Sequence, residues 1–198
     1  MTRPLASLLH AGAVRRGLRS GDTLPDEREV FELVRDLPYA RASGHAPETV
    51  IAEWRGTCST KHELLAALYA ELGVPSTIYA CTQEIRLPDG AATELAAWNG
   101  EPVIDVHNYL VLHERGRDRL IDATWPLAAR AAGLPANEWG HDMQIACTPL
   151  ETWALKPGED VATFKDAKLR ERYTPEQLER RDEFIRAVGR LFTRGEAG

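Results

Sequence analysis

Apolar side chains recur at helical spacing near the middle of the chain. Gly73 and Pro75 follow them and stop helices, so the pattern predicts a helix over residues 59–72. Shorter patterns of the same kind predict helices over residues 5–13 and 27–36 and from residue 174 onward, while residues 41–48 have the composition of a polar loop. The stripe of the central helix consists of Leu64, Leu65, Leu68, Tyr69 and Leu72.

Between the central and C-terminal helices, the pattern changes to that of strands. Residues 76–87 are rich in β-branched and aromatic side chains, and Pro88-Asp89-Gly90 then predicts a turn. Residues 103–112 and 119–124 predict two strands joined by a turn at Arg115-Gly116, which makes an antiparallel hairpin. Residues 126–150 predict a loop with a brief helix and a strand at residues 144–148. The fold class expected is α+β.

Composition narrows the class of protein. The 198 residues, 43% of them hydrophobic, are enough for one domain with its own core. A net charge of −6, from 30 acidic and 24 basic residues, offers no basic surface for nucleic acid. No run approaches the ~18 apolar residues of a membrane span, and arginines follow the first apolar stretch where a secretory signal has small residues. We therefore expect a soluble, cytoplasmic protein.

Cys58 is the first candidate for a catalytic residue, as a nucleophile. Three cysteines, an odd number in a chain of this length, argue against a disulfide framework, so the role of each cysteine is considered separately. Cys58 stands where the central helix begins, with Thr57 as a possible cap, or Thr60 with Glu63 three residues later. The positive end of a helix lowers a thiol's pKa, and its free N–H groups can bind an oxyanion. A small buried apolar side chain is the alternative interpretation.

His107 and Asp122 supply the other two groups that a cysteine nucleophile needs. A thiolate requires a base, and that base requires an acceptor to fix its orientation. If Arg115-Gly116 is a two-residue turn, His107 faces Thr124 and Asp122 is its diagonal neighbour, roughly 7–8 Å away between Cα atoms. The order Cys58, His107, Asp122 therefore predicts a catalytic triad with a cysteine nucleophile.

These blocks resemble bacterial transglutaminase-like proteins. Gly56-Thr57-Cys58, an Ala/Leu-rich helix ending in Leu-Gly-Val-Pro at residues 72–75, and then a histidine strand and an aspartate one hairpin later match that family's order over residues 54–125. The resemblance implies a papain-like core in which the capped cysteine helix packs on an antiparallel sheet, with additional N- and C-terminal helices. We expect residues 1–150 to form the catalytic domain and residues 151–198 a helical extension packed on it.

The sequence does not determine the substrate. The histidine block has Asn108 and Tyr109 where the family often has Ala and Trp, so we expect only a peptide, amide or other acyl substrate, handled by an acyltransferase, hydrolase or protease. Trp54, Asn108 and Trp125 are weak candidates for substrate binding. No cofactor is expected, and the oligomeric state is undetermined. Cys81 and Cys147, in apolar strand-like runs, are expected to react slowly.

Two other interpretations compete with the enzyme. A non-catalytic transglutaminase-like module could bind a partner in the same groove. A zinc-binding domain could use Cys58 and His62, spaced i, i+4, with further ligands among His107, His113, His141 and Cys147, although no C-x-x-C or H-E-x-x-H pattern is present. Lys61, His62 and Glu63 more simply form the polar face of the central helix.

Overall fold

A computed structural model describes residues 4–85, 102–114 and 116–194. Its elements, in chain order, are helices α1 (Leu5–Arg15), α2 (Glu27–Arg35), α3 (Pro47–Glu53) and α4 (Cys58–Glu71), strands β1 (Ser76–Glu84), β2 (Ile104–Glu114) and β3 (Arg117–Ile121), a 3-10 helix (Leu127–Ala132), strand β4 (Thr152–Ala154), and helices α6 (Val161–Arg172) and α7 (Pro175–Arg194). The expected α+β class is confirmed. The predicted turn at residues 88–90 lies outside the described residues.

The four strands form one antiparallel sheet in the order β3-β2-β1-β4. Strands β2 and β3 pair Glu114 with Arg117 and Leu110 with Ile121, which is the register predicted for the hairpin. Continuing that register beyond β3 places Asp122 diagonally across from His107. The hairpin's bend thus fixes which face of the sheet carries each of these two side chains.

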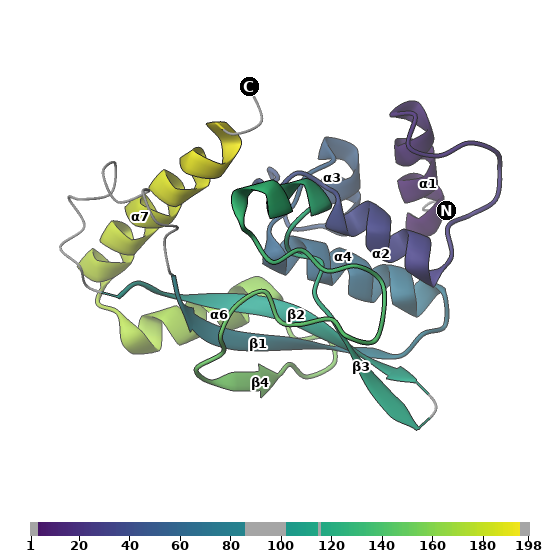
Figure 1. Cartoon of the computed structure of the whole chain (residues 1–198). Helices are drawn as coiled ribbons and strands as arrows, with labels where there is room; N and C mark the ends of the chain where they lie inside the picture. Colours follow the sequence, from purple (N-terminus) through teal and green to yellow (C-terminus); the bar gives the residue numbers. More distant parts are fainter. Residues whose placement is uncertain (1–3, 86–101, 115, 195–198) are drawn as a thin grey trace.

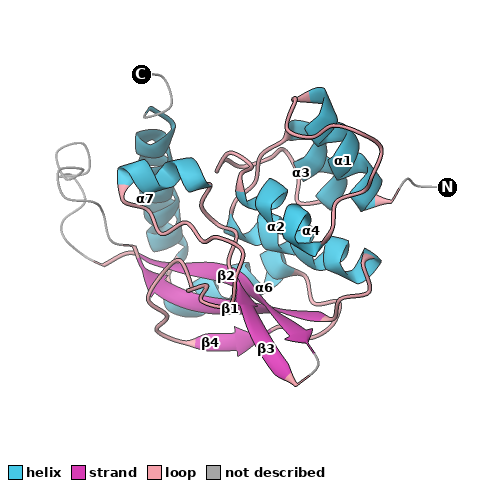
Figure 2. Ribbon diagram, turned by 45° about the vertical axis from the view of Figure 1, so that its right-hand side comes forward, coloured by secondary structure: helices cyan, strands magenta, loops and turns pink. Residues whose placement is uncertain are grey.

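The N-terminal helices cover one side of the sheet. Figures 1 and 2 show α1, α2, α3 and α4 gathered together, with α4 lying along the sheet. Helix α4 packs there through the buried part of its predicted stripe, and apolar residues of β2 and β3 complete the same core; Leu72, at the C-cap, is exposed. That core includes Leu64, Leu65, Leu68, Leu110, Leu112 and Ile121.

The C-terminal region packs against the same sheet through a smaller apolar cluster. Val161 and Leu169 of α6 meet Ala80 of β1 and Val106 of β2 there. Strand β4 lies beyond residue 150 and pairs with β1, so the region expected as a helical extension also contributes a strand. No helix in the described parts of the chain has the length and apolar character needed to cross a membrane.

Several local predictions were wrong. Helix α3 starts at Pro47, inside the predicted polar loop, and helix α6 was not predicted at all. Residues 144–148 form no strand; their backbone is held by side chains such as Asn137, which donates to the Gln144 carbonyl. Short elements of this kind depend on tertiary contacts more than on their own periodicity.

Candidate active site

Cys58 is the first residue of α4, and Thr57 is its N-cap with extended backbone. The Thr57 N–H donates to Thr60 Oγ1 at 2.9 Å, so the cap is built by Thr57 and Thr60. Gly56 precedes the cap in a crowded place, since a Cβ there would lie 3.0 Å from both Thr60 Oγ1 and Lys61 Cγ. This crowding explains the glycine two residues before the cysteine.

His107 and Asp122 meet as the hairpin register requires. His107 Nε2–H donates to Asp122 Oδ2 at 2.8 Å. The carboxylate is held further by backbone N–H groups, from Thr124 to Oδ1 at 3.0 Å and from Ala146 to Oδ2 at 2.7 Å. Asp122 is therefore fixed as an acceptor that orients His107.

The imidazole of His107 also lies close enough to the Cys58 thiol for the two groups to shift each other's pKa. Because Asp122 occupies Nε2, Nδ1 is the ring nitrogen left for the sulfur. Burial by itself raises the pKa of Cys58, but the hydrogen bond and charge of His107 outweigh it and lower the pKa to about 7. Burial opposes the charged form of His107, and Asp122 nevertheless raises the pKa of His107 well above its usual range. The pair is thus set up as thiolate and imidazolium near neutral pH.

All three groups are enclosed. Cys58 is 5% exposed, His107 2% and Asp122 1%. A cavity of about 230 Å³ lies against the start of α4, next to the nucleophile; its lining includes Arg41, His45, Thr57, Ser59, Lys165 and Arg181. The residues on either side of Cys58 thus reach this cavity.

His62 connects the helix to the acid. It lies one turn after Cys58 and is fully buried, so the expectation that it belongs to a polar face is wrong. Its Nε2 accepts the Ala123 N–H at 2.9 Å, which leaves the proton on Nδ1 to donate to the Cys58 carbonyl at 2.6 Å. Burial lowers the pKa of His62 to about 4, so the ring is neutral. His62 therefore positions Cys58 relative to the segment that carries Asp122.

Lys61 is also fully buried rather than on a polar face. Its Nζ donates to the Arg35 carbonyl at 2.8 Å and to the Thr124 carbonyl at 3.1 Å. Arg35 ends α2, where a cation is favoured by the helix dipole. Burial lowers the pKa of Lys61 to about 7. The side chain ties the nucleophile helix to α2 and to the residues after Asp122.

Tyr39 lies beside the nucleophile and was not foreseen from the sequence. Its backbone forms a β-bridge with Gly56, and its ring lies 4.4 Å from that of Trp125 between centroids. Burial first, and then the charge of the neighbouring Cys58, raises the pKa of the Tyr39 hydroxyl. Through Tyr39, the predicted residue Trp125 comes close to the site.

Of the other two weak substrate candidates, Trp54 packs on α1, whereas Asn108 follows His107 and bonds Ser59, next to Cys58. Trp54 packs against α1, with its ring 4.4 Å from the Arg16 guanidinium and close to Gly12. Asn108 is fully buried, and it accepts a hydrogen bond from Ser59 Oγ at 2.8 Å. Asn108 thus helps to hold α4 against β2, and we assign neither residue a contact with substrate.

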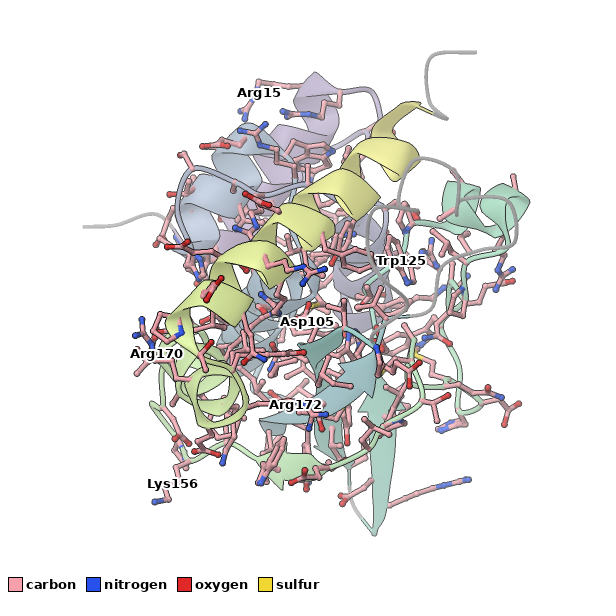
Figure 3. All side chains as sticks on the ribbon, turned by 90° about the vertical axis from the view of Figure 1, so that its left-hand side faces the viewer. Arg15, Asp105, Trp125, Lys156, Arg170 and Arg172 are labelled. Atoms are coloured by element: carbon pink, nitrogen blue, oxygen red, sulfur yellow. The ribbon has the colours of Figure 1, made fainter. Side chains whose placement is uncertain are left out.

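An ionic cluster borders the site on the side of α6 and α7. Asp105, two residues before His107, is 2.9 Å from Lys165 Nζ and pairs with Arg181. Figure 3 views the molecule from this side and shows Asp105 next to α7. The charge of Lys165 lowers the pKa of Cys58 and that of Asp105 raises it, so the cluster acts on the nucleophile.

Of the other two cysteines, Cys81 lies in a strand as expected and Cys147 does not. Cys81 is a buried residue of β1, but Cys147 lies in an irregular segment and is only half-buried. Their sulfur atoms are 3.7 Å apart, so the two thiols interact with each other. Cys81 is shielded from solvent, whereas Cys147 is partly exposed.

Of the other proposed metal ligands, His107 lies beside Cys58 but its Nε2 is bonded to Asp122. Both ring nitrogens of His62 are engaged by backbone groups, and His113 binds Thr77 and Asp118 at the far end of β2. Among the described residues, no group of three or more His, Cys, Asp or Glu side chains is arranged to hold a metal ion.

Comparison with known proteins adds no assignment. No protein-family model matches the chain, and no curated protein is significantly similar to it.

The sequence predicted the triad but missed its supports. His62 had a usable signal, since a residue four after Cys58 on the same helix lies on the same face. Tyr39, Asn137 and Arg181 gave no such signal, because they come from loops or from distant elements.

Proposed function

We propose that this protein is a cysteine-dependent acyl-transfer enzyme, an acyltransferase or amide hydrolase of the transglutaminase-like kind. The observation that supports it best is the arrangement of Cys58, His107 and Asp122. The thiol at the start of α4 lies against the imidazole, and the imidazole Nε2 is 2.8 Å from the Asp122 carboxylate. A helix that begins at the cysteine and packs on an antiparallel sheet also fits a papain-like core.

The reaction starts from the Cys58 thiolate and the His107 imidazolium. The sulfur attacks the acyl carbonyl, and His107 gives its proton to the leaving amine or alcohol as the tetrahedral adduct collapses to a thioester. Water or an amine then attacks the thioester and gives its proton to His107, and collapse of the second adduct expels the Cys58 thiolate, which restores the starting ion pair. Asp122 keeps Nδ1 directed at the sulfur throughout.

The oxyanion of each adduct forms next to the start of α4. The backbone N–H of Cys58 is one donor, and the Tyr39 hydroxyl, which contacts Cys58 in the resting site, is the second. The substrate reaches this point from the cavity beside Thr57 and Ser59. Replacing Tyr39 with Phe should then slow acylation by about 10²-fold while the thiol still alkylates; unchanged acylation would exclude this role.

The direct test is to trap the acyl-enzyme. The purified chain is incubated with activated esters and with a cell extract, and peptide mass spectrometry locates any acyl group. We expect acylation at Cys58, its complete loss in Cys58→Ala with the fold retained, and its persistence in the matched control Cys147→Ala. Acylation elsewhere, or equal turnover by Cys58→Ala, would contradict the proposal and favour a non-catalytic binding module.

A further inference from the structure

Cys81 and Cys147 form a pair of thiols beside the triad. Their sulfur atoms lie 3.7 Å apart. A disulfide bond is about 2.05 Å long, so a relative shift of about 1.7 Å would bring them to bonding distance. Cys147 is half-buried and thus open to a small oxidant, whereas Cys81 is 0% exposed. The hydrogen bond with Cys147 lowers the pKa of the Cys81 thiol, which favours Cys81 as the attacking sulfur.

Both cysteines are joined to the triad by the backbone. Cys81 faces His107 in the pairing of β1 with β2. Cys147 follows Ala146, whose N–H donates to Asp122 Oδ2 at 2.7 Å. Any movement of Cys147 toward Cys81 therefore acts on a hydrogen bond to the catalytic carboxylate.

The segment around Cys147 is anchored on both sides of it. Asn137 Nδ2 donates to the Gln144 carbonyl at 2.8 Å and to the Asp122 carbonyl at 2.9 Å. After Cys147, the Leu150 N–H donates to the Thr82 carbonyl at 2.8 Å. With both flanks held, a shift at Cys147 is absorbed locally, by residues that include the donor to Asp122.

We propose that Cys81 and Cys147 are a modification site, a reversible disulfide that slows the chemistry of Cys58 by disturbing Asp122. Formation of the disulfide stands by itself, while its effect on catalysis rests on the proposed function of Cys58. A reversible bond of this kind suits a protein in a reducing compartment, where disulfides are transient.

The oxidant is a hydroperoxide. The Cys147 thiol gives its proton to the leaving oxygen as its sulfur attacks the peroxide, which makes a sulfenic acid and releases water or an alcohol. The Cys81 thiolate then attacks the Cys147 sulfur, the S–S bond forms, and hydroxide leaves as water after taking up a proton. Two thiols lose two electrons and two protons to one peroxide, and a dithiol reductant reverses the change by thiol–disulfide exchange.

The first test asks whether the disulfide forms. Full-length Cys58→Ala is treated with hydrogen peroxide and mapped by mass spectrometry without reduction. We expect one Cys81–Cys147 link that dithiothreitol removes, and none in Cys58→Ala/Cys147→Ser. Accumulation of sulfinic acid at Cys147 without the link, or links only between chains, would overturn the proposal.

The second test asks whether the disulfide acts on the site. In chains that retain Cys58, peroxide should slow alkylation of Cys58 at pH 7 roughly two- to tenfold, the range that loss of one hydrogen bond covers. Cys147→Ser treated identically corrects for direct oxidation of Cys58 and should show no such loss beyond that background. Equal losses in the two chains would overturn the coupling to Asp122. An ordinary thiol reactivity of Cys58 before oxidation would instead refute the proposed function, while the mapping still decides the disulfide.

Discussion

At the scale of single residues, the site depends on opposing effects at one buried thiol. Burial raises the pKa of Cys58, and the contact with His107, together with the charge of Lys165, brings the pKa down to about 7. The same burial acts without such a partner at Lys61, whose ammonium has backbone carbonyls but no carboxylate as a bonded acceptor. The two residues therefore respond to pH for different reasons.

Alkylation of Cys58 should follow its ionisation, with a midpoint near pH 7, because the neighbouring His107 lowers the pKa of the thiol to about 7. In His107→Ala, the effect of burial dominates, so the midpoint for alkylation of Cys58 should rise above the pKa of ~8.5 of a free thiol. The rate of iodoacetamide labelling at Cys58, followed by peptide mass spectrometry from pH 5 to about pH 10, measures this. Overlapping profiles for the two chains would show that His107 does not activate the thiol.

Lys61 should make stability rise with pH. Its pKa is about 7 in the folded chain and about 10.4 when unfolded. Between these values the unfolded chain holds more protons, so the free energy of unfolding increases with pH, by an amount on the order of a few kcal/mol. Below the folded pKa both states are protonated and the penalty is constant.

Urea unfolding of Lys61→Met across that range is the measurement. The variant should lack the rise, so the difference between wild type and variant should grow in favour of wild type as the pH increases. The exposed Lys156→Met is the control and should parallel wild type. Parallel curves for Lys61→Met and wild type would contradict the lowered pKa.

At the scale of elements, the start of α4 is where local and tertiary requirements coincide. The cap formed by Thr57 and Thr60 gives the helix its beginning, and Gly56 must be small because Thr60 and Lys61 pack against it. The hairpin of β2 and β3 plays the corresponding part for the other two groups, since its register decides where Asp122 lies. The site therefore forms where the capped start of α4 packs against the β2–β3 hairpin.

Gly56→Ala tests the packing at the helix start. The added Cβ would lie 3.0 Å from Thr60 Oγ1 and Lys61 Cγ, so we expect a loss of about 1–3 kcal/mol in the free energy of unfolding. Gly140→Ala is a matched control, because no atom lies within 4 Å of a Cβ there. Equal urea midpoints for the two variants would show that the close approach at Gly56 has no energetic weight.

At the scale of the whole molecule, the C-terminal helices complete the surroundings of the site. Lys165 of α6 and Arg181 of α7 both bind Asp105, at the beginning of the strand that carries His107. Residues far apart in the chain thus share one buried ionic cluster. The cluster connects the packing of α6 and α7 to the electrostatics of Cys58.

Asp105→Asn should have two effects. It removes the buried carboxylate that pairs with both Lys165 and Arg181, which should cost about 3–5 kcal/mol of stability. It also removes a charge that raises the pKa of Cys58, so the alkylation midpoint should move to lower pH.

Asp182→Asn is the control for this cluster. Asp182 pairs with the same Arg181 but its side chain is 50% exposed, so the change should cost no more than about 1 kcal/mol. Thermal unfolding and the labelling profile of Cys58 measure the two effects. A shift of the midpoint to higher pH in Asp105→Asn would contradict this account.

The sequence by itself determined the α+β class, the central helix, the hairpin and the three residues of the candidate triad. These features are local, because helical spacing, a cap next to Cys58 and a two-residue turn each act over a few positions. The same reasoning misplaced Lys61 and His62, since a polar side chain on an exposed-looking face is buried only when a distant segment supplies its partners.

Only the tertiary structure decided what surrounds the triad. Tyr39, Asn137 and Arg181 reach it from a loop, an irregular segment and the last helix, and Cys147 meets Cys81 across 65 intervening residues of sequence. Long-range contacts of this kind depend on how the whole chain packs, and no periodic pattern encodes them. Apolar spacing thus fixed the elements, whereas the pairing of buried polar groups fixed the site.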